Sequence, residues 1–185
     1  MKKVFLTLTG LLVVLAISAA IYYKDVVESG GTETIRYIEP EENYQSLADL
    51  ANYPDLKGKV IYVDFWHTGC GPCFVEFESM PAMKEAFKNR NDMAFLYLGK
   101  DRSAPGEKFR WKRVIEKKNL TGYHFFMSNE QYDKFWEESV KDETVEKAFP
   151  HYLIIDRDGA VVHQHAPRPS DQNLLAVLGK VLDKN

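Results

Sequence analysis

Apolar runs short enough for strands alternate with longer, charged stretches from residue 59 onward. Residues 59–66 and 93–98 are rich in β-branched and aromatic side chains and nearly apolar on both faces, which is typical of central strands in a covered sheet. The stretches that follow them predict helices at residues 71–89 and 107–118. An order of strand, helix, strand and helix indicates an α/β fold.

Shorter elements are expected in the C-terminal part of the chain. They are a strand at residues 124–127, helical turns at 130–138 and 143–148, and two strands at 152–156 and 160–164. The last two strands predict a β-hairpin, because Asp158 and Gly159 lie between two apolar runs. Ser170 is expected to cap a last helix whose apolar positions share one face: Leu174, Leu178, Val181 and Leu182. Together these elements predict a sandwich with a mixed sheet.

The N-terminus predicts a membrane segment. Residues 4–23 contain no charged side chain, Lys2 and Lys3 precede them, and Lys24 follows them. A helix of these 20 residues would span the hydrocarbon layer, because each residue adds about 1.5 Å and the layer is about 30 Å thick. The two lysines stay inside by the positive-inside rule, so the chain after Lys24 is predicted to be exported.

The apolar segment is interpreted as an uncleaved anchor, with a cleaved signal peptide as the alternative. Small residues at 18–20 would suit signal peptidase, but the run is longer than the usual signal core. Tyr22 and Tyr23 also suit an aromatic belt at the membrane interface.

Three segments follow from these patterns. Residues 1–24 form the anchor or signal, and residues 25–57 form a linker and a short extension. The extension includes a possible strand at residues 34–38 and a short helix at 45–52. Residues 58–185 form the folded domain.

Composition narrows the range of functions. With 45% hydrophobic residues the chain is typical of packed globular proteins, and wholesale disorder is excluded. Lys and Arg number 24 against 27 Asp and Glu, which gives a net charge of −3. No stripe of basic residues interleaved with aromatics is present in the sequence, so we exclude a nucleic-acid partner.

The only two cysteines of the chain, Cys70 and Cys73, form a CxxC motif after a predicted strand and at the start of a predicted helix. A disulfide that closes so small a loop adds little stability, so this context indicates redox chemistry. The N-terminus of a helix stabilises a thiolate, and we expect the pKa of Cys70 to lie below the usual value of about 8.5. Cys70 is then the attacking thiol and Cys73, more buried, the resolving thiol. A zinc knuckle would need two further ligands at suitable spacing, and the sequence has none.

Residues 63–73 (VDFWHTGCGPC) resemble the active site of thioredoxin. Together with the exported N-terminus, residues 56–60 (LKGKV) and residues 152–159 (YLIIDRDG), they resemble the TlpA/ResA-like thiol:disulfide oxidoreductases of the thioredoxin superfamily. The resemblance implies a thioredoxin-like three-layer sandwich, with a mixed central β-sheet flanked by helices. It also implies that the disulfide of the CGPC motif is the redox group and that no further cofactor is needed.

The resemblance implies roles for four residues beside the cysteines. Asp64 corresponds to the buried acid that assists proton transfer to Cys73, and a carboxylate in an apolar strand should have a raised pKa. The alternative is that Asp64 is merely hydrogen-bonded in a polar pocket. Trp66 either faces the substrate or belongs to the core. Pro150 corresponds to the cis-proline that leaves the backbone of Phe149 free to pair with an extended substrate, although it could instead simply end a helix.

The motif also has features of its own. Gly71 and Pro72, between the cysteines, are expected to contact the substrate. Gly69 stands where thioredoxins usually carry tryptophan, which predicts a more open rim. Pro81 lies further along the helix than the family's usual kink and puts the helix register in question. Phe149 and His151, which flank Pro150, are expected to shape the substrate groove.

A metal site is the rival interpretation. His163 and His165 share one face of a predicted strand, and His67 lies close to the cysteines in sequence. With Cys70 and Cys73 they could bind copper, as in copper-binding metallochaperones of the thioredoxin fold. His67 could instead favour the Cys70 thiolate when protonated, or be an exposed bystander. A peroxidase is disfavoured because the CGPC spacing suits dithiol exchange, and a scaffold with a vestigial motif has no support.

The expected function is an exported, membrane-tethered thiol:disulfide oxidoreductase that exchanges its dithiol with partner proteins. The resemblance implies a reductase that receives electrons from a membrane donor and acts on protein disulfides, such as those of apocytochromes. The expected location is the bacterial inner membrane, facing the periplasm. Cleavage of the N-terminal segment would make the protein periplasmic.

Overall fold

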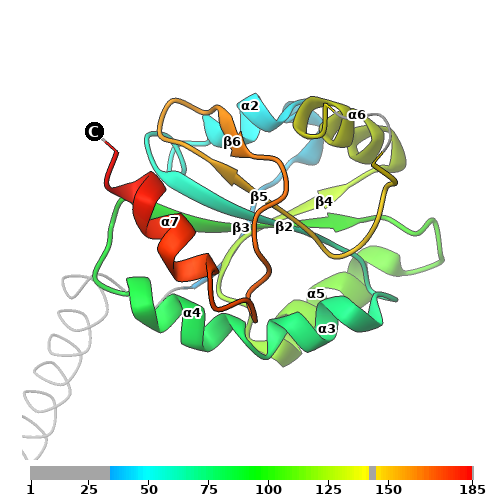
Figure 1. Ribbon diagram of the computed structural model, residues 1–185. Coiled ribbons are helices and arrows are strands. Elements are labelled where there is room, and N and C mark those ends of the chain that lie inside the picture. The colour runs from blue at the N-terminus through cyan, green and yellow to red at the C-terminus, as the bar shows by residue number, and fades with distance from the viewer. Residues whose placement is uncertain (1–33, 142–144, 185) are drawn as a thin grey trace, which may run out of the picture. The chain divides into compact units, whose positions relative to one another are not determined.

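The computed structural model describes residues 34–141 and 145–184, and Figure 1 shows them as a coloured ribbon. Contacts divide the chain into the units Met1–Thr34 and Ile35–Asn185, and all described residues except Thr34 belong to the second unit. The predicted anchor at residues 4–23 lies outside the described residues. Among the residues that the structure describes, no helix is long and apolar enough to cross a membrane.

A six-stranded mixed sheet forms the centre of the unit Ile35–Asn185, as predicted. Its order is β1-β4-β3-β2-β5-β6. The strands are β1 (Ile35–Tyr37), β2 (Val60–Trp66), β3 (Met93–Lys100), β4 (Gly122–Met127), β5 (His151–Ile155) and β6 (Val161–His163). The first four strands in this order run parallel to one another, whereas β5 runs antiparallel to both β2 and β6. The buried strand β2 therefore lies where the parallel and antiparallel parts of the sheet meet.

Helices cover both faces of the sheet and make three layers (Figure 1). One face carries α3 (Gly71–Phe77), α4 (Met80–Phe87), α5 (Glu107–Lys118) and α7 (Leu174–Leu182). The other face carries α2 (Leu47–Ala51) and α6 (Asn129–Ser139). Because successive side chains of a strand point to opposite faces, Tyr62, Asp64 and Trp66 of β2 share the face that α3 covers.

Residues from Ile35 to 57 belong to the same compact unit as residues 58–185. Strand β1 pairs with β4 in parallel, with Ile35 beside Gly122. A short 3₁₀ helix, η2 (Glu41–Asn43), follows β1. Helix α2 begins after Ser46, whose hydroxyl accepts the Asp49 N–H at 3.0 Å. The predicted extension thus supplies a strand and a helix to this unit.

The single helix predicted at residues 71–89 is wrong, because two helices occupy this stretch. Helix α3 ends at Phe77, and α4 begins at Met80 with Pro81 in its first turn. Proline is tolerated in a first turn but not inside a helix, where it lacks an N–H and clashes with the preceding turn. Pro81 therefore starts a helix instead of bending one.

Two other predictions about helices are wrong. Residues 145–148 are not helical, and residues 142–144 lie outside the described residues. Helix α7 has Asn173 rather than Ser170 at its N-cap. Ser170 instead donates its backbone N–H and its hydroxyl to the Glu76 carboxylate.

The hairpin of β5 and β6 is confirmed. Gly159 has φ +83°, a conformation that favours glycine. The Asp156 carboxylate accepts the N–H groups of Asp158 at 3.1 Å and Ala160 at 2.9 Å, which closes the turn.

Candidate functional site

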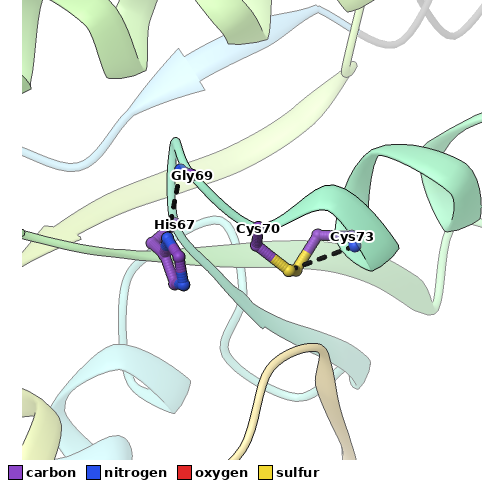
Figure 2. Close-up of a disulfide and its surroundings, with 4 residues drawn as sticks. All are labelled: His67, Gly69, Cys70 and Cys73. Atoms are coloured by element: carbon purple, nitrogen blue, oxygen red, sulfur yellow. Dashed lines mark hydrogen bonds between the residues drawn. A yellow bond between two sulfur atoms is a disulfide. The ribbon is translucent and has the colours of Figure 1, made fainter.

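Cys70 and Cys73 form a disulfide at the N-terminus of α3, with 5.3 Å between their Cα atoms (Figure 2). Cys70 is the N-cap residue, and its sulfur accepts the backbone N–H of Cys73 at 3.1 Å. Cys73 is completely buried, whereas 4% of Cys70 is exposed. The expectation that Cys73 is the more buried of the two residues is confirmed, and attack by Cys70 stays a prediction.

The start of α3 suits a reactive thiol. Pro72 occupies the first turn, and both Gly71 and Pro72 are exposed beside the disulfide. The N-terminal N–H groups of a helix and its dipole favour negative charge at this point. A lowered pKa of the reduced Cys70 thiol stays a prediction.

Asp64 lies on the face of β2 that α3 covers, and 1% of it is exposed. Its neighbours across the sheet are Tyr97 on β3 and Tyr152 on β5. Neither carboxylate oxygen has a hydrogen-bond partner among the described residues, which gives no support to the interpretation as a merely hydrogen-bonded group. Burial raises the pKa of Asp64 well above its usual value, and the nearby Glu76 raises it further.

Glu76 is a residue of this site that the sequence analysis missed. It lies one turn after Cys73 on α3, and 4% of it is exposed. Its carboxylate accepts the backbone N–H and the hydroxyl of Ser170, both at 3.0 Å, and Arg168 Nη1 lies 3.5 Å away. A glutamate three positions after the resolving cysteine was the signal available in the sequence, because this spacing puts both residues on one helix face. We call Asp64 and Glu76 the inner carboxylates.

The peptide bond between Phe149 and Pro150 is cis, as predicted. Because Phe65 pairs with His151, the cis bond lies beside the end of β2 and the start of the active-site loop. The Phe149 ring packs edge-on against His67, with 4.8 Å between ring centroids. No described residue in the stretch before Pro150 is helical, so the interpretation of Pro150 as a helix stop is wrong.

Trp66 belongs to the core. It has no exposed surface, and its ring packs edge-on against Phe77 with 5.2 Å between centroids. The predicted contact between Trp66 and a substrate is therefore not available in this conformation. Its place at the end of β2, directly under α3, explains the burial.

Beside Cys70, the rim of the site is filled rather than open. A Cβ atom on Gly69 would lie 2.7 Å from Nη1 of Arg102, so the guanidinium occupies the space next to this glycine. The expectation of a more open rim is wrong for this reason. We call His67, Gly69 and Arg102 the outer rim.

His67 is not a cation that helps the Cys70 thiolate. Its Nδ1 accepts the Gly69 N–H at 3.1 Å (Figure 2). Burial lowers the pKa of His67, and the charges of Arg102 and Lys100 lower it further against an opposing effect of Glu107. At neutral pH the permanent charge of the outer rim is therefore that of Arg102.

The other histidines do not join the cysteines. His165 lies against His151, with 5.3 Å between ring centroids, and burial lowers the pKa of His151 to about 4. In residues 34–141 and 145–184, no three His, Cys, Asp or Glu side chains are grouped so that they could hold a metal ion. The geometry therefore gives no support to the copper site suggested by His163, His165 and the CxxC motif.

Comparisons with known proteins agree with this site. A family model described as Redoxin matches residues 38–178. A proposed thiol-disulfide oxidoreductase from Bacteroides vulgatus is 29% identical with a TM-score of 0.55, over 74% of this chain and 78% of that chain. A comparison with curated proteins gave no match.

Two further solved structures share the fold. The thioredoxin domain of a thiol-disulfide oxidoreductase from Bacteroides vulgatus is 24% identical with a TM-score of 0.52, over 67% of this chain and 79% of that chain. A thiol:disulfide interchange protein of the thioredoxin family from Chlorobium tepidum is 19% identical with a TM-score of 0.53, over 68% of this chain and 81% of that chain. These two structures support the fold, and the match to the Redoxin family confirms the resemblance to the thioredoxin superfamily.

Proposed function

This chain belongs to the Redoxin family and is a thiol:disulfide oxidoreductase, and we propose that it is an exported, membrane-tethered reductase of protein disulfides. One observation carries the proposal. Behind the Cys70–Cys73 disulfide at the start of α3 lies a buried carboxylate, Asp64, with no hydrogen-bond partner among the described residues. Such a carboxylate is suited to accept a proton from the resolving thiol.

The reaction begins with the reduced pair. The Cys70 thiolate attacks a disulfide of the partner, whose S–S bond breaks as a mixed disulfide forms and one partner thiolate leaves. Cys73 then gives its proton to Asp64 and attacks the Cys70 sulfur. The Cys70–Cys73 bond forms, the second partner thiolate leaves, and two electrons have passed to the partner. A membrane electron donor returns two electrons to the disulfide.

Charges around the disulfide support the reducing direction. A strongly oxidising pair requires a reduced form that is stabilised. Here Gly71 and Pro72, the residues between the cysteines, carry no charge, and the buried charged residues on the inner side are Asp64 and Glu76. Negative charge behind the disulfide opposes a thiolate, so Glu76, and Asp64 once it has lost its proton, favour transfer of electrons to the partner.

Location and partners are proposed from the sequence. The uncharged residues 4–23 suit an anchor in the bacterial inner membrane, with the Redoxin domain on the periplasmic side. Cleavage of this segment would release the protein into the periplasm. The proposed substrates are disulfides of exported proteins, including apocytochromes.

A trapping experiment tests this proposal. The full chain with Cys73→Ser is expressed in a bacterial host that is then quenched with acid and a thiol-blocking reagent. Because the variant lacks the resolving thiol, we expect it to hold exported proteins in mixed disulfides, which non-reducing electrophoresis resolves. Cys70→Ser is the matched control and should hold none.

Two further readouts test direction and location. Wild-type protein in the quenched cells should be mainly a dithiol, and a maleimide that cannot cross the inner membrane should label it in spheroplasts. A wild-type pool that is mainly disulfide would contradict the reducing direction. Labelling only after the inner membrane is opened would contradict export.

A further inference from the structure

The loop after β3 brings Arg102 to the active site. Trp66 at the end of β2 pairs with Gly99 of β3, so the residues that follow Gly99 run beside those that follow Trp66. Ser103 fixes the loop: it has φ +56°, its N–H is donated to Asp101 at 2.8 Å, and its hydroxyl accepts from Asn129 at 2.9 Å. The backbone that carries Arg102 is thus held in place beside the active-site loop.

The guanidinium of Arg102 lies beside Gly69, the residue before Cys70. The contact distance at Gly69 places Nη1 about 4 Å from the Gly69 Cα, and neighbouring Cα atoms are about 3.8 Å apart. Nη1 is therefore within about 8 Å of the Cys70 Cα. A partner segment joined to Cys70 must pass over this surface, since Gly69 and Gly71 are exposed on either side of Cys70.

Arg102 also has an unused charge. Among the described residues, no carboxylate lies within ion-pair distance of Arg102 or Lys100, and Arg102 is exposed. Glu107 is the acid whose charge opposes that of Arg102 and Lys100 in its effect on the pKa of His67. It is buried, accepts a hydrogen bond from the Thr68 hydroxyl and pairs with Arg110 at 2.7 Å. Glu107 is thus already satisfied, and within the outer rim the exposed charged residue is Arg102.

We propose that Arg102 determines specificity by pairing with a carboxylate next to the reactive cysteine of the partner protein. This inference deepens the proposed function and rests on it. Arginine suits the task because its planar fork binds both oxygens of a carboxylate. The pair forms in the mixed disulfide and in the encounter that precedes it, so acidic flanking residues accelerate the first attack.

Peptide disulfides measure this preference directly. The full chain is reduced, freed of reductant and mixed with peptides whose one cysteine is joined to 2-mercaptoethanol. The residues on both sides of the cysteine are Glu, Gln or Lys in an otherwise identical uncharged sequence. The initial rate of peptide thiol release is measured at 20 mM and 500 mM salt, and the Glu:Lys rate ratio is the readout.

The wild-type ratio is expected to be about 5 at low salt and to approach about 1 at high salt. An exposed ion pair contributes a modest free energy, and salt screens it. Arg102→Glu should invert the ratio, and Arg102→Gln should bring it close to 1. Lys117→Glu is the matched control for Arg102→Glu, because it changes the net charge by the same amount. Lys117 lies about 15 Å along α5 from Glu107, so this variant should keep the wild-type ratio.

The ratio separates recognition from general damage, because each variant is compared with itself on two peptides. The inference is overturned by a wild-type ratio near 1, or by a ratio that Arg102→Glu and Arg102→Gln leave unchanged. In either case the proposed function remains intact, because the protein still exchanges with the peptides. Absence of exchange with every peptide overturns both.

Discussion

The two sides of the disulfide differ in burial and in charge. The inner carboxylates, Asp64 and Glu76, are buried, at 1% and 4% exposure. On the outer rim Arg102 is exposed and cationic, and His67 next to it is only half-buried. The same pair of sulfurs is therefore placed between buried carboxyl groups and an exposed cation.

This difference assigns separate tasks to the two sides. A buried charge acts strongly at short range and is little affected by salt, so the inner carboxylates suit proton transfer and control of redox potential. An exposed charge is screened and contributes modestly, which suits choice among partners. Three substitutions test the division, in order of decreasing expected effect.

Asp64→Asn removes the proton acceptor. The first attack by Cys70 should stay nearly unchanged, whereas release of the mixed disulfide should slow about 100-fold, because general base catalysis contributes effects of this size. In wild type the release rate should rise with pH through the raised pKa of Asp64, and the variant should lose this rise. Stopped-flow measurement of both steps checks the prediction, and an unchanged release rate would remove Asp64 from the mechanism.

The same substitution should stabilise the fold at high pH. The folded pKa of Asp64 lies well above 3.8, so the native state holds a proton that the unfolded state loses as pH rises, and stability falls through this window. Asp64→Asn should therefore raise the free energy of unfolding by about 1–3 kcal/mol at pH 8 and have little effect at pH 3.5. Denaturant titrations of the oxidised protein measure this.

Asp158→Asn, in the exposed hairpin turn, is the control for that stability measurement. It should show no comparable gain at pH 8. An equal effect of Asp64→Asn at both pH values would mean that the aspartate is not protonated on folding.

Glu76→Gln removes one inner charge and keeps the shape of the side chain. The thiolate form of the reduced pair then becomes more favourable, and the reduction potential should rise by about 10–30 mV, since 30 mV corresponds to about 1.4 kcal/mol. Ser170→Ala, which keeps the charge and removes one hydrogen bond to Glu76, should shift the potential less. Equilibration with glutathione buffers gives both values.

Arg102→Gln should move the potential in the opposite direction. Loss of an exposed cation disfavours the thiolate slightly, so the potential should fall by at most about 10 mV at low salt and by less at 500 mM salt. Shifts of the same sign in Glu76→Gln and Arg102→Gln would contradict the separation of the two sides.

The parts of this site that the sequence predicted are local in the chain. Cys70 and Cys73 are identified by their spacing and by the strand that precedes them, and Asp64 by its place in an apolar strand. The cis bond at Pro150 followed from the resemblance to thioredoxins. Each of these needs only a short stretch of sequence or a known motif.

The parts that could not be predicted depend on contacts between distant segments. Glu76 is held by Ser170, which is 94 positions away, and this contact also removed Ser170 from its expected role as a helix cap. Arg102 reaches Gly69 only because of the register between β2 and β3, which no local pattern specifies. Trp66 is an aromatic residue in a motif, but its exposure depends on how α3 packs over β2.

The equilibrium reduction potential of the Cys70–Cys73 pair in the wild-type chain tests the central claim most directly. The inner carboxylates and the uncharged Gly71 and Pro72 predict a reductant, with a potential near the roughly −270 mV of thioredoxin. A value near about −120 mV would mark a strong oxidant and would contradict both the reducing direction and the influence assigned to the inner carboxylates.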